Sequence, residues 1–460
     1  MKRAVMRPAR QACLARQACL ALLALAVLAA CGRTAATPGS TPVDAPATSA
    51  GAATAGPAVT PPGGATTAPE VLRVWLPAQF DPQAEGEAAQ ALNNRLETFS
   101  RQHAGLTIEV RVKAVDGPGG LIDALTAASA AAPAALPDVV ALPRELMETA
   151  ALKGLLAPHE RLTGAMQASD WYEYARGLAR LQQDVYGVPF AGDAMGLIYR
   201  PSAAAPPSGQ IGTGQATQPP GQPAQPPQQW SQVIAGGAPL LFAAGDPQAR
   251  LTLALYQSSG GSVRDEQGRP AIDSLALTEV LSYYQATQRA GVSPAWLTQY
   301  QSDDQTWEDF QAGRGPMVVG WTSSYLGSPA EDQAMGLLPT QDGTPFAPVS
   351  GWMWCLSARE PVRRELAAEL VEFLAESSFL AGWTEAAGYL PTRPSALHLW
   401  SNTQLQQQLA KLAAAAQVAP LSDVTGALSG PFQRATLEVL TGQSSPAAAA
   451  QTAAGSLTGP

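Results

Sequence analysis

The sequence is poor in cysteine. Its 460 residues contain 4 cysteines, three of them within the first 31 positions, so only Cys355 lies further along the chain. A single internal thiol cannot form an intramolecular disulfide, and a chain of this length can fold without one. Cys355 lies in an apolar run at 352–356, so we interpret it as a small buried hydrophobic residue in preference to a nucleophile.

Positive charge is also scarce. The chain has 28 basic and 37 acidic residues, a formal net charge of −9. Removal of the five basic residues in the first 16 positions would leave −14. No basic stripe stands out, so binding to nucleic acid is not expected. The overall field does not favour an acidic ligand either.

Catalytic signatures are lacking. The chain has 3 histidines and no His-Glu-x-x-His, Gly-x-Ser-x-Gly or Cys-x-x-Cys motif. The acidic residues at 303–309 lack the spacing of an EF-hand loop, so we interpret them as a helix cap and a solvated face. We predict no metal, no cofactor and no enzymatic activity. A surface glycan-degrading enzyme remains an alternative, because two carboxylates for glycoside hydrolysis can come from any part of a chain.

Long apolar runs are absent too, since crossing a bilayer takes about 20 apolar residues. The run at 18–30 is shorter, follows a basic leader and ends at Cys31, which is typical of a secretory signal. Its last residues, Leu-Ala-Ala-Cys, resemble the lipobox of bacterial lipoproteins, which implies cleavage before Cys31 and its acylation. An ordinary signal peptide is the alternative. We predict a signal peptide at 1–30 and an extracytoplasmic protein anchored to the bacterial cell membrane through lipidated Cys31.

Two segments lack large apolar residues. Residues 31–69 are mainly Ala, Thr, Pro, Gly and Ser, a composition that predicts a disordered tether. Residues 201–229 are rich in Pro, Gln and Gly and predict an exposed insertion.

Strand and helix patterns alternate after the tether. Apolar alternation at 70–76 predicts a strand, and an amphipathic pattern at 87–102 predicts a helix. A strand at 106–115, a helix at 121–131 and a strand at 138–142 follow, an order that implies a parallel sheet with crossover helices. Further downstream the patterns predict strands and helices in the following ranges: strands at 239–243, 317–321, 335–338 and 346–356; helices at 230–235, 247–257, 274–290, 304–312, 361–377, 405–416 and 432–440.

The stretch at 186–200, Tyr-Gly-Val-Pro-Phe-Ala-Gly-Asp-Ala-Met-Gly-Leu-Ile-Tyr-Arg, holds two extended runs. Pro189 predicts a strand end or edge for the first run, because proline has no N–H for the ladder. The second run is apolar on both faces, as in a strand buried on both sides. The pair is either a hairpin or one segment crossing between two lobes with Gly192 as its flexible point, and the rest of the chain favours the crossing.

Several stretches recur in a characteristic order around this crossing. They are Pro-Asp-Val-Val at 137–140, Trp-Ser-Gln-Val-Ile at 230–234, Phe-Gln-Ala-Gly-Arg-Gly-Pro-Met at 310–317 before Val-Val-Gly-Trp, and Gly-Tyr-Leu-Pro-Thr-Arg at 388–393. With them the chain resembles extracellular solute-binding proteins of family 1, the maltose-binding type, which are lipoprotein components of ABC importers. The resemblance implies an α/β fold of two hinge-linked lobes with a ligand cleft between them, as in periplasmic binding proteins.

The resemblance also implies a division of the chain. Lobe 1 comprises 70–190 and 344–394, the latter with the return crossover. Lobe 2 comprises 191–343, and C-terminal helices at 395–460 pack mainly on it.

The implied function is capture of a solute, by inference a sugar or oligosaccharide, through lobe closure and delivery to ABC permease subunits. The protein is expected to be a monomer. A sensing or adhesion lipoprotein without a transporter is the remaining alternative.

Tryptophan is abundant, with 10 Trp against 9 Phe, and indole rings stack on the apolar C–H faces of sugars. Four tryptophans at predicted strand ends or crossings are therefore candidate ligand contacts, with filling of the core as the alternative. The resemblance places an acidic sugar contact at Asp193, which could instead form a turn. The full set of predicted ligand-binding residues is Trp321, Asp193, Trp352, Trp75, Trp354, Ser323, Gln79 and Arg144. Arg393 is interpreted as structural at a helix end.

Overall fold

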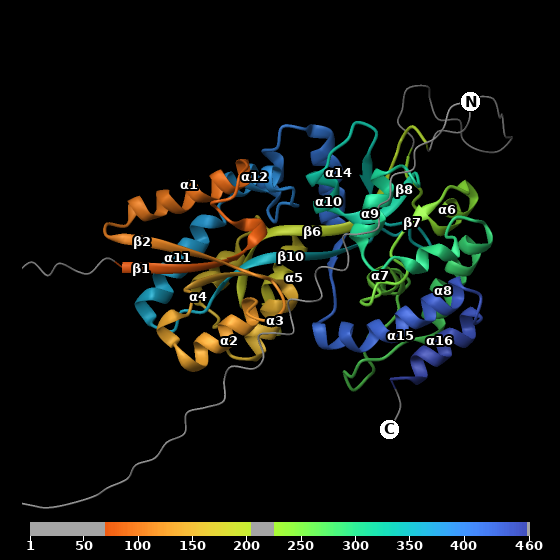
Figure 1. The fold of residues 1–460 in the computed structure, drawn as a ribbon, viewed down its shortest axis with the longest axis horizontal. Coiled ribbons are helices and arrows are strands. Elements are labelled where there is room, and N and C mark those ends of the chain that lie inside the picture. The colour runs from red at the N-terminus through yellow and green to blue at the C-terminus, as the bar shows by residue number, and fades with distance from the viewer. Residues whose placement is uncertain (1–69, 204–224, 458–460) are drawn as a thin grey trace, which may run out of the picture. The chain divides into compact units, whose positions relative to one another are not determined.

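The computed structural model describes residues 70–203 and 225–457. The predicted signal peptide, Cys31, the tether and most of the insertion lie outside the described residues. In the described part, the main sheet has nine strands in the order β2-β1-β3-β10-β6-β8-β7, with β11 paired to β10 and β9 to β6 (Figure 1). No helix in these two ranges is long and apolar enough to cross a membrane.

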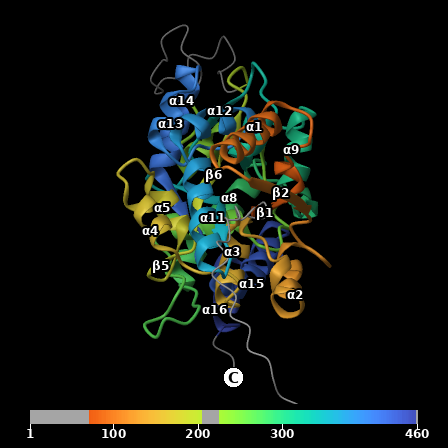
Figure 2. The ribbon, with the colours of Figure 1, turned by 90° about the vertical axis from the view of Figure 1, so that its left-hand side faces the viewer.

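The first three strands are parallel, as predicted. β1 (Glu70–Pro77) pairs with β2 (Leu106–Lys113) and with β3 (Val139–Pro143). Helices lie on both faces of these strands, and together they form the first lobe (Figures 1 and 2): α1 (Glu87–Gln102) and α12 (Ser377–Ala387) lie on one face, α2 (Leu121–Ala131) and α3 (Arg144–Leu152) on the other. The apolar stripe of α1 is buried, as its amphipathic pattern requires.

Two long strands belong to both halves of the sheet. β6 (Gly187–Tyr199) pairs through its first half with β10 (Ala347–Leu356) and through its second half with β8 (Met317–Trp321). The far end of β10 pairs with β3. The stretch at 186–200 is therefore one continuous crossing strand and not a hairpin. Pro189 lies near its start, where the register with β10 shifts and a missing N–H is tolerated.

The second lobe contains β8 and the strands and helices packed around it: β7 (Leu240–Leu241), β9 (Ala334–Gly336), α6 (Trp230–Gly236), α7 (Arg250–Ser258), α8 (Ser274–Arg289), α9 (Asp303–Gln311) and α10 (Thr322–Gly327). Near the C-terminus, α15 (Ser422–Leu440) and α16 (Pro446–Gly455) pack on α8 (Figure 1). A third crossing is short: β11 (Ala416–Val418) pairs with the start of β10.

The remaining elements complete the described chain: η1 (Ala78–Phe80), η2 (Pro133–Ala135), α4 (Glu160–Gln167), α5 (Glu173–Ala179), β4 (Arg180–Leu181), β5 (Asp184–Val185), η3 (Ala295–Gln299), α11 (Pro361–Leu374), α13 (Pro394–His398) and α14 (Thr403–Ala415).

Some sequence-based details were wrong. The cap of α9 is Ser302, whose hydroxyl accepts from the backbone of Gln305, and not an aspartate. The predicted strand at 239–243 is only two residues long, and the helix predicted at 361–377 ends at Leu374. The helix predicted at 432–440 begins ten residues earlier, because Pro431 lies inside α15 instead of ending a preceding loop.

Aromatic side chains fill the core beneath the crossing strands. The Phe80 ring makes edge contacts with Phe190, Trp352, Trp383 and Tyr389, at centroid distances of 5.3, 5.0, 5.5 and 5.7 Å. Cys355, also on β10, is fully buried, and burial raises the pKa of its thiol well above the usual value. This confirms the interpretation of Cys355 as a small buried residue of the core.

Candidate ligand-binding site

A cavity of about 310 Å³ lies between elements of the two lobes. The first lobe contributes α3, and the second contributes α7, α15 and Trp321. The crossing strands supply Met195 of β6, 348–350 of β10 and Val418 of β11. We call this space the inter-lobe cavity. Its walls come from parts of the chain that the crossing strands connect, so a movement of one lobe relative to the other would change its size.

Two predicted ligand residues line this cavity, Trp321 and Arg144, and Trp321 is the more exposed of the two. It ends β8, whose preceding residues are buried, and it directly precedes α10. Its side chain is half-buried, and its indole N–H donates a 2.7 Å hydrogen bond to Asp303 Oδ2. That bond fixes the orientation of the ring while the ring still contributes to the cavity wall.

A charged group from each lobe lies at the cavity. Arg250, on α7, pairs with Asp246 at 2.9 Å and lies 3.6 Å from Asp303. Glu145, on α3, is an exposed residue that lines the cavity. Partial desolvation of its carboxyl group raises the pKa, and the positive charge of Arg250 opposes that rise. Burial likewise raises the pKa of Asp303. The two lobes thus bring opposite charges toward the same space.

Asp193 is anchored to the start of α10. One carboxylate oxygen accepts from the Thr322 hydroxyl at 2.8 Å and from the Ser323 backbone N–H at 2.9 Å. The other accepts from the Ser323 hydroxyl at 2.6 Å. Burial nevertheless raises the pKa of Asp193 to about 6, against the lowering effect of these bonds. Asp193 and Ser323, both predicted ligand contacts, therefore bind each other and fix the helix that follows Trp321.

Trp352 and Gln79 lie in another neighbourhood, beside the Phe80 cluster. Trp352 is half-buried and touches Phe80 edge-on, while Gln79 is exposed and hydrogen-bonds the Tyr389 phenol. Tyr389 belongs to the 388–393 motif, which is tied to β6 by paired backbone bonds of 2.8 Å between Gly192 and Leu390.

The other predicted contacts have structural partners. Arg144 lines the inter-lobe cavity but is only 7% exposed, and its guanidinium bonds Glu148 at 2.6 Å and the Leu178 carbonyl at 2.5 Å. Trp75 is buried with Lys113 over its ring at 5.1 Å. Trp354 is 1% exposed and stacks on Phe190 at 4.2 Å. Neither Trp75 nor Trp354 lines the inter-lobe cavity, so both are residues of the core.

Arg393 is held at the start of α13, as its structural interpretation implies. Its guanidinium lies 3.8 Å from the Trp171 ring centre and 3.6 Å from Asp170.

Sequence reasoning missed three of the charged residues at the cavity. Glu145 and Arg250 carry no local signal, because they come together only when α3 and α7 pack on opposite sides of the crossing strands. Asp303 was interpreted as a helix cap; it is not itself a lining residue, and its contacts with the lining residues Trp321 and Arg250 connect it with the cavity. In residues 70–203 and 225–457, no group of three or more histidine, cysteine, aspartate or glutamate side chains is arranged to hold a metal ion.

Two lobes that share crossing strands and enclose a cavity define a two-lobe binding protein. The chain belongs to the bacterial extracellular solute-binding proteins, because residues 94–414, more than half of its length, match the sequence model of that family. No protein with a curated functional description matches it by sequence.

Solved structures share the fold. The maltose-bound MalE3 of T. maritima is 19% identical with a TM-score of 0.63, over 84% of this chain and 99% of that one. The cyclic alpha-maltosyl-1,6-maltose binding protein of Arthrobacter globiformis is 18% identical with a TM-score of 0.65, over 85% and 98%. A solute-binding protein of Thermotoga lettingae bound with alpha-D-tagatose is 19% identical with a TM-score of 0.61, over 84% and 98%.

Proposed function

We propose that this protein binds a carbohydrate or polyol in the inter-lobe cavity and delivers it to the permease of an ABC importer. The observation that carries the proposal is Trp321, an oriented indole on the wall of a cavity that both lobes form. Structures with the same fold hold maltose and alpha-D-tagatose. These ligands are uncharged and present both C–H faces and hydroxyls.

The chemistry of the cavity suits such a ligand. An indole offers an apolar face to a sugar ring, and the glutamines, serines and threonine along the wall, with Glu145 and Arg250, offer partners for hydroxyls. The other two lining charges, Arg144 and Glu148, are already paired with each other. The role we propose is therefore binding without chemical conversion of the ligand.

Lobe closure would couple binding to delivery. β6 and β10 pass through both halves of the sheet, and a small bend in these strands would move α3 toward α7 across the cavity. We further propose that the protein acts as a monomer outside the cytoplasm and that lipidated Cys31 holds it at the membrane beside the permease.

A thermal-shift screen tests the proposal. The probes are maltose, maltotetraose, tagatose and ribitol, each at increasing concentration, with glutamate and choline as non-carbohydrate controls. A ligand that binds only the folded state raises the melting temperature by mass action. We expect at least one carbohydrate or polyol to raise it in a saturable manner, confirmed by calorimetric titration. A shift with the controls alone would contradict the proposed ligand class.

A further inference from the structure

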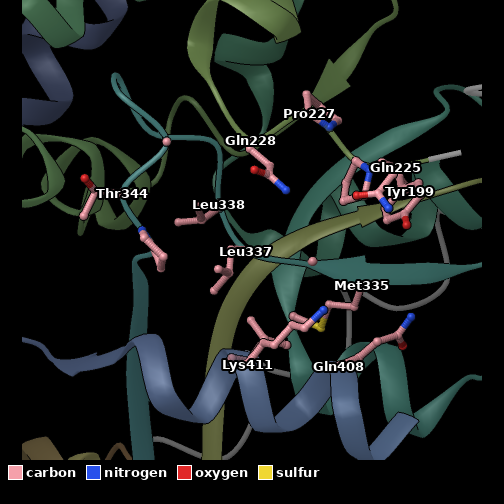
Figure 3. Close-up of a pocket in the computed structure, with 15 residues that line it drawn as sticks. Tyr199, Gln225, Pro227, Gln228, Met335, Leu337, Leu338, Thr344, Gln408 and Lys411 are labelled. Carbon is pink, nitrogen blue, oxygen red and sulfur yellow. The ribbon is translucent and has the colours of Figure 1, made fainter. Parts of the chain in front are cut away.

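A second cavity, of about 330 Å³, lies in the second lobe and shares no lining residue with the inter-lobe cavity (Figure 3). Five segments form it: the end of β6, residues 335–338 at and after the end of β9, residues 343–345, the extended residues 225–228, and one face of α14. The extended segment is fixed by backbone bonds, from Thr340 N–H to the Gln228 carbonyl at 3.1 Å and from Trp230 N–H to the Thr340 carbonyl at 2.9 Å. The cavity therefore has held walls. We call it the β9 cavity.

The inner surface of the β9 cavity is apolar. Tyr199, Met335, Leu338 and Leu412 are each buried in the lobe and contribute to its lining. Neighbouring prolines add further apolar surface. A small molecule with an apolar ring or chain could remove this surface from water, which is the main source of affinity in such cavities.

One charged side chain lines this cavity, that of Lys411 on α14. Among the residues that the structure describes, no hydrogen-bond or ion-pair partner of Lys411 is found, and no carboxylate lines the cavity. Figure 3 shows the Lys411 ammonium extending toward the cavity from α14, and the Gln228 amide extending toward it from the opposite segment. Lysine is rare in this chain, with 4 in 460 residues, and Lys411 is an exposed residue that borders the cavity, so its ammonium is free to pair with a ligand.

We propose that the β9 cavity is a second binding site, for a small apolar molecule that carries one anionic group. The anionic group, a carboxylate or sulfonate, pairs with Lys411 and accepts from the amide of Gln228. The apolar part lies against Met335, Leu338 and Leu412. Charge complementarity selects this occupant, because an ion pair beside apolar surface is stronger than one in open solvent.

Fluorescence titration of the full chain tests this proposal with two matched probes. 1-Anilinonaphthalene-8-sulfonate is an apolar anion, and N-phenyl-1-naphthylamine is its uncharged counterpart. We expect saturable one-to-one binding of the anion and at least tenfold weaker binding of the neutral probe. Lys411→Gln should weaken binding of the anion at least tenfold and leave the neutral probe unchanged. Lys153→Gln, at an exposed lysine after α3, is the control and should change neither.

Other results would overturn the proposal. Equal affinity for the two probes, or an unchanged affinity for the anion in Lys411→Gln, would mean that the cavity is an apolar surface without anion selectivity. A variant with 204–224 replaced by a Gly-Ser link gives a further test. If the anion binds this variant and not the full chain, the chain's own segment occupies the cavity. Melting curves of each variant establish that it is folded.

Discussion

At the scale of single residues, both carboxylate oxygens of Asp193 are hydrogen-bonded to residues at the start of α10. Its carboxylate holds the start of α10, and its neighbour Ala194 donates through its backbone N–H to Thr322 Oγ1 at 3.0 Å. The bonds compensate only in part for burial, which raises its pKa to about 6. The residue that the family resemblance assigns to a ligand thus already positions the helix after Trp321, and any contact with ligand would be added to that role.

The pH dependence of stability should report on Asp193. A carboxyl whose pKa is higher in the folded than in the unfolded state binds its proton more tightly when folded, so its contribution to stability falls as pH rises from about 4 to about 6. Asp193→Asn removes this titration, while the amide can still accept from Ser323 N–H and donate to Ser323 Oγ. We expect the variant to be more stable than the parent above pH 6, with a difference that shrinks toward pH 4.

Thermal melting between pH 4 and pH 8 measures this difference. Asp184→Asn, at an exposed position on β5, is the control and should follow the parent at every pH. A constant difference between Asp193→Asn and the parent across this range would show that Asp193 keeps the same charge throughout.

Trp321 should carry much of the affinity for the ligand of the inter-lobe cavity. Trp321→Ala removes the stacking surface, and we expect a loss of about 2 kcal/mol in binding, roughly 30-fold in Kd, the scale of an interface hot spot. Trp321→Phe keeps an aromatic face but loses the bond to Asp303, so its Kd should lie between those of the parent and Trp321→Ala. Calorimetric titration with the ligand from the screen measures each. The control is Trp296→Ala, at a tryptophan that is 40% exposed, and it should bind as the parent does. Normal binding by Trp321→Ala would place the ligand elsewhere.

At the scale of elements, the predictions that succeeded rest on signals within a single stretch of sequence. The helix predicted at 87–102 has those bounds because its apolar residues form one stripe, and the strand at 317–321 has those bounds because it is a short apolar run that is buried on both faces. α10 was missed, since its six residues lack such a period and begin at bonds from Asp193 on another strand.

The residues that each lobe contributes to the cavity could not be predicted either, because they come together through contacts between distant parts of the chain. Trp321 and Trp354 each occur in an apolar strand, and only the packing of Phe190 against Trp354 distinguishes a core ring from a cavity ring. Sequence periodicity indicates which face of an element is buried. It does not indicate which distant residue covers that face, and the presence of Glu145 and Arg250 at one cavity depends on such an arrangement.

Gly192 is a steric requirement of the crossing strand. A Cβ there would lie 2.5 Å from the Tyr174 hydroxyl oxygen, which donates to the Pro391 carbonyl at 2.7 Å. Gly192→Ala should therefore push the 388–393 motif away from β6 and reduce the free energy of unfolding by about 1–3 kcal/mol, as overpacking does. Tyr174→Phe removes the nearest clashing atom, while Cε2 at 2.9 Å and Cζ at 3.0 Å remain, so the double variant should be less destabilised than the sum of the singles but not fully restored.

Urea unfolding of the four proteins in this cycle measures the coupling. The control is Gly382→Ala in α12, where a Cβ meets nothing within 4 Å and helix propensity favours alanine. Strict additivity of Gly192→Ala and Tyr174→Phe would show that the hydroxyl is not the obstacle.

At the scale of the whole molecule, attachment to the membrane is predicted to depend on Cys31. Cys31→Ser removes the thiol that the lipobox resemblance assigns to acylation, so the variant should take up no lipid. Metabolic labelling with a tagged fatty acid, followed by separation of membrane and soluble fractions, measures this in cells. Cys355→Ser is a poor control because it lies in the core, so Cys19→Ser, within the predicted signal, is used instead. Label retained in Cys31→Ser would contradict the lipoprotein prediction.

We expect the insertion to divide into a part that the fold does not need and a part that it does. The whole of 201–229 was predicted to be exposed, yet its end is built into the second lobe: Gln229 bridges to Thr340, and Pro226 lies against Gly336.

Replacing 204–224 with a short Gly-Ser link should leave the melting temperature within about 2 °C of the parent, a few tenths of a kcal/mol in a domain of this size. Extending the replacement through 229 removes the Gln228 carbonyl that accepts from Thr340 N–H and the packing of Pro226 on Gly336, and it should lower the melting temperature by several degrees. Differential scanning calorimetry of the two variants, with ligand binding measured in parallel, separates these effects. If the shorter replacement already lowers the melting temperature as much as the longer one, then residues 204–224 pack against the fold and the division proposed at 225 is wrong.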